Sequence, residues 1–309
     1  MTGGAGFIGS HLVGQLTEKG LVVTVFDNMS TGTFSNIRPH VGKKNFRLVK
    51  ADVRSAQRVR EETKSSDVVF HLAAVTDIQR SLRDPLFVDH VNVLGTLNLL
   101  EACRKADTDL IVYASSCAIY GNVGRMRIRE DAPVSPISTY GVSKLAAESY
   151  CLSFHKCYGL RVVCLRFFNV YGPRQNPEPY ASVVARFVQR LLSNKTPIIY
   201  GDGEQSRDFV NVKDTVKACL LPLERGNAVG QAINIGSGIS ITINELARYL
   251  MKLTDKVNLK PTHKPAREGE VRHSCANTDL AHRVLGYMPT VSLNDGLQEY
   301  IEWFKRTAR

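Results

Sequence analysis

The chain opens on a glycine-rich turn over residues 2–9 that contains three evenly spaced glycines, Gly3, Gly6 and Gly9. The turn leads into an amphipathic stretch, 7–19, and the next apolar run, 21–26, is followed by Asp27. In a strand–turn–helix unit, such glycines allow a tight turn, close approach of a diphosphate to the backbone, and packing of the helix on the strand. The helix N-terminus would bind the phosphates, and Asp27 would bind the adenosine ribose. The pattern favours a dinucleotide-binding fold over an ordinary strand-to-helix turn.

Short apolar runs rich in β-branched residues recur along the chain, at 21–26, 46–49, 68–72, 110–113, 162–168 and 232–235. Segments of helical periodicity separate most of them, at 7–19, 56–64, 85–105, 140–158, 180–192, 213–224, 243–253 and 294–306. This alternation predicts an α/β fold, a Rossmann-type doubly wound parallel sheet with helices on both faces. After Asn169 the alternation ends and turn-rich stretches appear, which predicts a smaller, mostly C-terminal second domain.

Composition sets limits on the kind of protein. The 309 residues are 43% hydrophobic and 22% charged, which is typical of a globular chain with one large or two modest domains. Without a leader pattern or an apolar run near the ~18 residues of a membrane span, we expect a cytoplasmic protein without membrane contact. Seven scattered cysteines predict reduced thiols, and the histidines lack metal-ligand spacing. The net charge of +11 is interpreted mainly as a solvated basic face rather than a nucleic-acid surface.

Further motifs follow the glycine turn in order: Asp52-Val53, His71-Leu72-Ala73-Ala74, Asn92, Ser115-Ser116 and Tyr140-Gly141-Val142-Ser143-Lys144. With the Gly-x-x-Gly-x-x-Gly spacing, they resemble the extended branch of the short-chain dehydrogenase/reductase family. Later motifs, at 166–174, 201–203, 207–209 and 267–270, look like those of the nucleotide-sugar epimerases. The resemblance is closest to UDP-glucose or UDP-N-acetylglucosamine 4-epimerases, and it covers most of the chain.

The resemblance implies that Ser116, Tyr140 and Lys144 are catalytic. Tyr140 and Lys144 lie four apart on a predicted helix, so they share one face. A phenol with its usual pKa of ~10 is a poor base at neutral pH, but a nearby ammonium and the positive nicotinamide of NAD would favour phenolate. Tyr140 would then take the proton of the sugar's 4-hydroxyl while NAD takes the hydride from carbon 4. Ser116, four residues before Tyr120, is preferred for bonding the reacting oxygen, and Ser115 would satisfy backbone groups.

The cofactor implied is NAD, with expected contacts at Gly3, Gly6, Phe7, Ile8, Asp27, Asn28, Asp52, Val53, Ala73, Ala74, Asn92, Tyr140, Lys144 and Phe167. By resemblance, Asp52 reads the adenine edge through its carboxylate and Val53 through its amide. A helix N-cap is the alternative role for Asp52. The acid at position 27, followed by Asn28 rather than a basic residue, favours NAD over NADP.

The resemblance also implies a set of substrate-binding residues, namely Ser116, Asn169, Ile198, Tyr200, Arg207, Arg267 and Ser274. Asn169 would lie near the diphosphate, with Arg207 and Arg267 as its cationic partners, because guanidinium pairs with phosphate in two places. Ile198 and Tyr200 would hold uracil through their backbones. Surface ion pairs are the alternative for the arginines, and core packing is the alternative for the other two.

The expected function is an NAD-dependent UDP-sugar 4-epimerase that interconverts UDP-glucose and UDP-galactose, and also the N-acetylated pair, by transient oxidation at carbon 4. Ser274 occupies the position that faces the sugar's 2-substituent in 4-epimerases, and a small residue there leaves room for an N-acetyl group. Cys117-Ala118 replace the Asp-Glu of related 4,6-dehydratases and the glutamate of decarboxylases. Alternatives are a UDP-glucuronate 4-epimerase, a nucleotide-sugar reductase, and a non-catalytic basic binding module.

By resemblance, residues 1–168 and 209–236 form the NAD-binding domain, and 169–208 and 237–309 form the substrate domain. A homodimer is expected through the helices at 85–105 and 140–158. Relatives usually carry several apolar residues before Thr-Gly-Gly, whereas only Met1 stands there in this chain. We therefore expect the first strand to be nearly absent, either because the chain starts late or because the sheet tolerates a stub. A central parallel strand is buried on both faces, so its loss should weaken stability and NAD retention.

Overall fold

The computed structural model describes residues 1–175 and 182–307. Six parallel strands form the main sheet: β1 (Val23–Asp27), β2 (Phe46–Lys50), β3 (Val68–His71), β4 (Leu110–Ser116), β5 (Val162–Phe167) and β9 (Ala232–Ile235). β1 pairs with β2, and the other four follow the order β3-β4-β5-β9. The predicted Rossmann-type parallel sheet is therefore confirmed.

The two halves of this sheet are joined by the first residues of the chain. Thr2 forms parallel bridges with both Phe26 and His71. Its amide donates to the carbonyl of Phe70 at 3.0 Å, and Gly3 donates to the carbonyl of Phe26 at 3.0 Å. His71 is buried between two threonines, with its ring nitrogens 2.7 Å from Thr2 Oγ1 and 2.9 Å from Thr96 Oγ1. A stub of three residues thus provides the hydrogen bonds of the central position.

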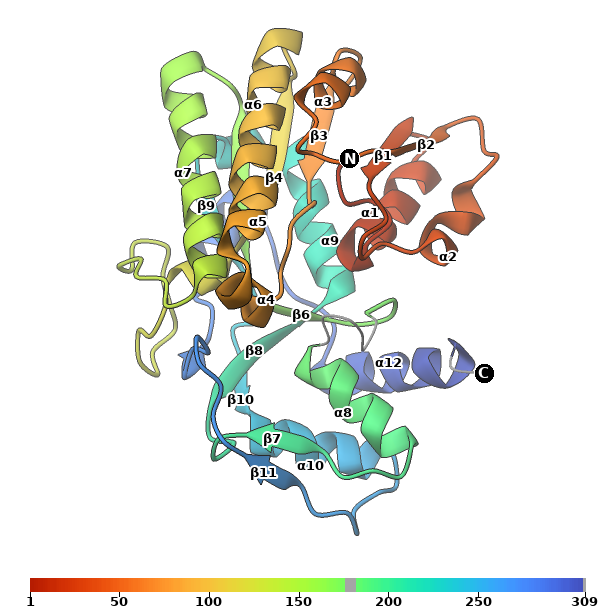
Figure 1. Cartoon of the computed structure of the whole chain (residues 1–309), viewed down its shortest axis with the longest axis vertical. Helices are drawn as coiled ribbons and strands as arrows, with labels where there is room; N and C mark the ends of the chain where they lie inside the picture. The colour runs from red at the N-terminus through yellow and green to blue at the C-terminus, as the bar shows by residue number, and fades with distance from the viewer. Residues whose placement is uncertain (176–181, 308–309) are drawn as a thin grey trace.

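Helices cover both faces of the main sheet (Figure 1). Side chains of α1 (Phe7–Glu18), α9 (Val212–Leu220) and α11 (Asp279–Leu285) share one apolar core with the strands. Side chains of α3 (Ala56–Thr63), α6 (Gly95–Ala106) and α7 (Thr139–Tyr158) share the core of the other face. Burial on both faces explains why the strands are nearly continuous apolar runs.

The helix predicted at 85–105 is interrupted by a wider turn. α5 (Pro85–Asp89) continues through a π-helical turn, His90–Leu94, into α6. The predicted helix at 213–224 ends earlier, as α9 gives way to a 3-10 turn at Leu221–Leu223 that contains a proline. The periodicity did not reveal three short helices of the described chain, α2 (Phe34–Ile37), α4 (Ile78–Arg83) and α11. The wide turn coincides with Asn92, whose contacts are described below.

A second group of elements lies below the main sheet in Figure 1. β8 (Ser206–Asn211) pairs with β6 (Asn169–Tyr171), β10 (Ser240–Thr242) and β12 (His273–Ser274), and β7 (Ile198–Tyr200) pairs with β11 (Thr262–Lys264). An apolar core joins α8 (Val183–Leu192), α10 (Ile243–Leu253) and α12 (Leu293–Thr307). The helix predicted at 180–192 is α8, and its first predicted residues lie outside the described ones. β8 runs across the predicted boundary at 209, so the two regions share this strand.

Candidate active site

A cavity of about 1160 Å³ lies between the carboxyl ends of the main-sheet strands and the lower group of elements. Asp27 from the end of β1, Ser116 from β4 and Phe167 from β5 line one side, and β7 and β8 contribute the other. In open parallel sheets, ligands bind at this carboxyl edge. Most residues predicted from the sequence line this one cavity: Gly3, Gly6, Phe7, Ile8, Asp27, Asn28, Val53, Ala73, Ala74, Ser116, Tyr140, Lys144, Phe167, Asn169, Ile198, Tyr200, Arg207, Arg267 and Ser274.

Tyr140 and Ser116 meet at the junction of α7 and β4. Ser138 caps α7 by accepting from the amide of Gly141 at 3.1 Å, and the amide of Tyr140 donates to Ser81 Oγ at 3.0 Å. These contacts fix the first turn of the helix. The phenol then forms a side-chain hydrogen bond with Ser116, which lowers the pKa of Tyr140, but burial dominates and raises that pKa to about 12.

Lys144 lies one turn deeper on the same face of α7. Its ammonium donates to the carbonyl of Ala114 and lies 4.4 Å from the ring centre of Tyr113. Burial lowers the pKa of Lys144 to about 8. Lys144 is not among the groups that shift the pKa of Tyr140 here, and its ammonium is engaged by a backbone carbonyl. The expected lowering of the Tyr140 pKa also depends on the positive nicotinamide of bound NAD, so it stays a prediction.

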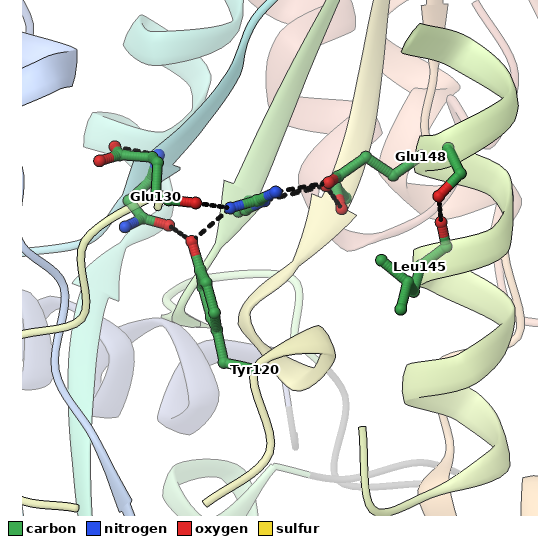
Figure 2. Close-up of polar contacts among 8 residues, drawn as sticks. Tyr120, Glu130, Leu145 and Glu148 are labelled. Atoms are coloured by element: carbon green, nitrogen blue, oxygen red, sulfur yellow. Dashed lines mark hydrogen bonds and ion pairs between the residues drawn. The ribbon is translucent and has the colours of Figure 1, made fainter. Parts of the chain in front are cut away.

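Ser115, beside the candidate catalytic serine, has a different partner from the one expected. Its hydroxyl donates to Glu148 Oε2 at 2.5 Å rather than to a backbone group. Glu148 is paired in turn with Arg166, and Figure 2 shows this buried cluster between α7 and the loop that carries Tyr120 and Glu130. The hydroxyl of Ser115 is therefore committed, which leaves Ser116 as the serine that bonds Tyr140.

The glycine turn is as tight as the sequence predicts. Gly3 has a φ of +70°, and a Cβ there would lie 2.7 Å from the amide nitrogen of Ala73. A Cβ on Gly9 would lie 2.1 Å from the carbonyl oxygen of Gly3. α1 begins after Gly6 with neither a side-chain cap nor an acidic residue in its first turn. Its first amides therefore face the cavity uncapped, which fits the diphosphate of a dinucleotide.

Asp27 ties the end of β1 to the glycine turn. Its carboxylate accepts from the amides of Ala5 at 2.9 Å and Met29 at 2.8 Å. Each oxygen accepts a second hydrogen bond readily, so the carboxylate retains capacity for the hydroxyls of a ribose. Burial raises the pKa of Asp27 and these two amides lower it. The residue that the sequence assigns to the ribose is thus held rigidly at the cavity wall.

Asp52 and Asn92 are absent from the cavity lining among the described residues. Arg54 binds both oxygens of Asp52, each at 2.9 Å, and thereby holds the pKa of Asp52 down, at about 2. Asp52 is not the cap of α3 either, because Ser55 holds that position. Asn92 bonds both backbone groups of Val75, at 2.8 and 3.0 Å, so it shapes the loop that lines the cavity. The side chains of Asp52 and Asn92 therefore lie behind the cavity lining, because they are hydrogen-bonded to Arg54 and to the Val75 backbone.

The opposite wall carries the predicted anion-binding residues. Asn169 Nδ2 is buried without a hydrogen-bond partner among the described residues. Arg207 donates to the carbonyl of Ser206 at 2.9 Å, and its burial lowers its pKa. The guanidinium of Arg267 lies 3.5 Å from the ring centre of Tyr200. Of these three, the Asn169 amide lacks an acceptor, whereas Arg207 bonds a backbone carbonyl and Arg267 lies 3.7 Å from a Glu270 oxygen. A buried unpaired donor is costly, so Asn169 favours a ligand that accepts a hydrogen bond, and the two guanidinium groups favour an anion.

The sequence reasoning missed Arg174, which also lines the cavity. Its Nη1 is buried without a partner among the described residues, and its backbone has a φ of +68°. The neighbouring carbonyl of Pro173 is 2.8 Å from His11 Nε2 on α1, which brings Arg174 close to the start of that helix. The motif at 166–174, which Arg174 ends, could have drawn attention to this residue. The sequence could not show that the residue lines the cavity.

The described ranges contain no helix that is both long and apolar enough to cross a bilayer. Within residues 1–175 and 182–307, no group of three or more His, Cys, Asp or Glu side chains could hold a metal ion.

The fold and the site together define an extended short-chain dehydrogenase/reductase. They combine a Rossmann-type parallel sheet, a glycine turn with an acidic residue after β1, and a Ser–Tyr–Lys set at the carboxyl edge of the sheet. Residues 1–236 match the model of the NAD dependent epimerase/dehydratase family. A UDP-glucose 4-epimerase of Mycolicibacterium smegmatis is 37% identical, over 100% of this chain and 99% of its own. The chain therefore belongs to the NAD-dependent epimerase/dehydratase family, and NAD is its cofactor.

Two solved structures extend the comparison. The UDP-glucose 4-epimerase of Thermotoga maritima with UDP-glucose has a TM-score of 0.94 and 38% identity, and the match covers 100% of this chain and 98% of that one. The UDP-N-acetylglucosamine 4-epimerase of Methanobrevibacter ruminantium, in complex with UDP-N-acetylmuramic acid, has a TM-score of 0.93 and 35% identity. That match covers 99% of this chain and 97% of the other. Both the fold and the class of nucleotide-sugar enzyme are shared along the full length.

Proposed function

We propose that the protein is a UDP-sugar 4-epimerase that interconverts UDP-glucose and UDP-galactose, and also the N-acetylated pair. The observation that carries this proposal is the convergence of Ser116, Tyr140 and the unpartnered Asn169 donor on one cavity beside the uncapped glycine turn. The names of the relatives support the same reaction. The homologous family also includes dehydratases, so the choice among reactions depends on the proton donors in the site.

In this proposal, NAD supplies a reversible hydride acceptor when bound. Tyr140 takes the proton of the sugar's 4-hydroxyl, and Ser116 donates a hydrogen bond to the same oxygen. Arg207 and Arg267 hold the diphosphate, with the Asn169 amide as a further donor. Because these groups bind the nucleotide part of the substrate and not the hexose, the 4-keto sugar can rotate about its diphosphate link. With the cofactor bound, the hydride would return to the opposite face of carbon 4, and Tyr140 returns the proton to the 4-oxygen.

The absence of a carboxylate at positions 117 and 118 favours epimerisation over elimination. Cys117 stands there with a thiol whose pKa burial raises to about 11, so it is neutral at physiological pH. Elimination or decarboxylation needs an additional acid at the sugar, as the resemblance to those enzymes indicates. The site supplies Tyr140 as its acid and base.

A panel of UDP-sugars tests the proposal. Purified protein with added NAD should convert UDP-glucose to UDP-galactose and the reverse, with no net change in reduced cofactor, because the hydride returns to the sugar in each turnover. Chromatography with mass analysis of the products distinguishes an isomer from a dehydrated or decarboxylated product. Conversion of UDP-glucuronate alone, or net consumption of reduced nucleotide, would point to the alternative epimerase or to the reductase.

Ser274 is predicted to decide whether an N-acetyl group fits. It is 5% exposed, it lines the cavity, and its hydroxyl lies 3.7 Å from Cys117 Sγ, next to the candidate catalytic serine. Ser274→Tyr would fill this space, so turnover of UDP-N-acetylglucosamine should fall at least about 10-fold more than that of UDP-glucose. Ser274→Ala, which stays small, should retain both activities. Equal losses for the two sugars in Ser274→Tyr would reject this role.

A homodimer is the expected assembly. α5, α6 and α7 lie side by side on one face (Figure 1), and exposed apolar side chains are found on α5, on α7 and in the π-helical turn between α5 and α6. Leu86 is 74%, Val142 52% and Leu94 43% exposed. Burying such surface favours association, so light scattering at micromolar concentration should give twice the chain mass, and Val142→Glu should lower it. Tyr249→Glu, at an exposed ring on α10, is the matched control. A monomeric wild type would contradict the prediction.

A further inference from the structure

A buried ion pair lies behind the groups that face the cavity. Glu148 on α7 and Arg166 on β5 have side chains that are 2% and 8% exposed, and Arg166 Nη2 lies 2.7 Å from Glu148 Oε1. Arg166 Nε donates to Glu148 Oε2 at 3.1 Å, and this oxygen also accepts from Ser115 on β4. Neither charged residue lines the cavity. Three elements of the fold thus meet at one carboxylate.

Lys144 provides a second contact between the same helix and strand. It lies four residues before Glu148, so both project from one face of α7. The Lys144 ammonium donates to the carbonyl of Ala114, one residue before the serine that bonds Glu148. α7 is therefore tied to two successive residues of β4, and the next residue of that strand is Ser116. Tyr140, at the start of α7, reaches Ser116 through this docking.

The other side of Arg166 extends the cluster away from α7. Its Nη1 donates to the hydroxyl of Tyr120 at 2.6 Å and to the carbonyl of Glu130 at 3.0 Å. Tyr120 donates onward to Asn234 Oδ1 on β9 at 2.7 Å. Figure 2 shows Glu148 on one side of the cluster and Tyr120 and Glu130 on the other. All three nitrogens of the guanidinium are bonded, as a buried cation requires, and this fixes its geometry.

We propose that Glu148 and Arg166 are positioning residues for the reaction, because their ion pair sets how α7 docks on β4 and thereby holds Tyr140 against Ser116. The inference rests on the proposed function, since turnover is its main readout. An error of about 1 Å in the placement of a reacting group can cost about 100-fold in rate, so a docking contact can matter without touching substrate.

The test replaces both charges with apolar side chains of similar size, in the double variant Glu148→Leu/Arg166→Met. Neither charge of the pair is left buried without its partner, so the protein should fold with a near-normal melting temperature. The hydrogen bonds to Ser115 and Tyr120 are lost, so kcat should fall about 10-fold or more while KM and NAD affinity stay near wild type. With UDP-glucose deuterated at carbon 4, the isotope effect on kcat should rise, because the chemical step has become slower.

A second variant tests the positioning role in case the double variant does not fold. Ser115→Ala breaks one link and keeps the ion pair, so it should show a smaller loss of kcat with the same rise in isotope effect. Ser149→Ala is the control, because its hydroxyl donates to the carbonyl of Leu145 on its own helix, at 2.8 Å, and to no other group of the described residues. Wild-type kcat and isotope effect in a folded double variant or in Ser115→Ala would overturn the positioning role. A wild type that converts no UDP-sugar would reject the proposed function, and the positioning role with it.

Discussion

Replacing Tyr140 with phenylalanine should lower kcat by about 100-fold or more, because the substitution removes the hydroxyl that transfers the proton and leaves the ring in place. KM for UDP-glucose and NAD affinity should change little, since the glycine turn and the arginines proposed to bind the diphosphate are untouched. The hydroxyl forms one hydrogen bond, with Ser116, so the loss of stability should be about 1 kcal/mol. Steady-state kinetics, calorimetric binding of NAD and a thermal melt measure the three quantities.

Tyr113→Phe is the matched control for this experiment. Tyr113 is buried on β4, its hydroxyl has no hydrogen-bond partner among the described residues, and it is not part of the cavity lining. Its ring, which lies near the Lys144 ammonium, is kept by the substitution. This variant should turn over like wild type. Near-normal turnover in Tyr140→Phe would reject the assignment of the proton-transfer group, and equal losses in both variants would attribute the effect to packing.

Replacing Gly9 with alanine should destabilise the protein and weaken NAD binding together. The added methyl group would lie 2.1 Å from the carbonyl oxygen of Gly3, so α1 or the turn has to move. Overpacking of this kind costs about 1–3 kcal/mol, and displacement of the turn moves the uncapped amides that face the cavity. A thermal melt and titration with NAD measure the two effects.

Gly14, on the same helix, gives the control. A Cβ there has no neighbour closer than His40 Nε2, at 4.0 Å. Gly14→Ala should therefore stabilise the protein by up to about 1 kcal/mol through helix propensity and leave NAD affinity unchanged. If Gly9→Ala melted and bound NAD like Gly14→Ala, close packing of the helix on the turn would not be the reason for the third glycine.

Local patterns predicted much of the fold. The alternation of apolar runs and helical periodicities gave the six strands of the main sheet and the long helices, because each depends on burial that repeats within a few residues. It missed the short helices α2, α4 and α11 and all the strands of the lower region, such as β6 and β7. These strands are two to six residues long, and pairing with distant strands stabilises them. Their sequences carry too little periodicity to be distinguished from loops.

The chemistry of the candidate site divides in the same way. Sequence by itself determined the glycine turn, Asp27 after β1, and Tyr140 and Lys144 on one face of a helix, because each follows from spacing within one or two turns of chain. Only the tertiary structure decided that Asn92 lies behind the cavity wall, where it bonds the backbone of Val75. The tertiary structure also decided which partner each buried polar group bonds, as in the hydrogen bond of Ser115 with Glu148 and the ion pair of Glu148 with Arg166. Such partners come from separate elements, and packing selects among all the polar groups of the chain.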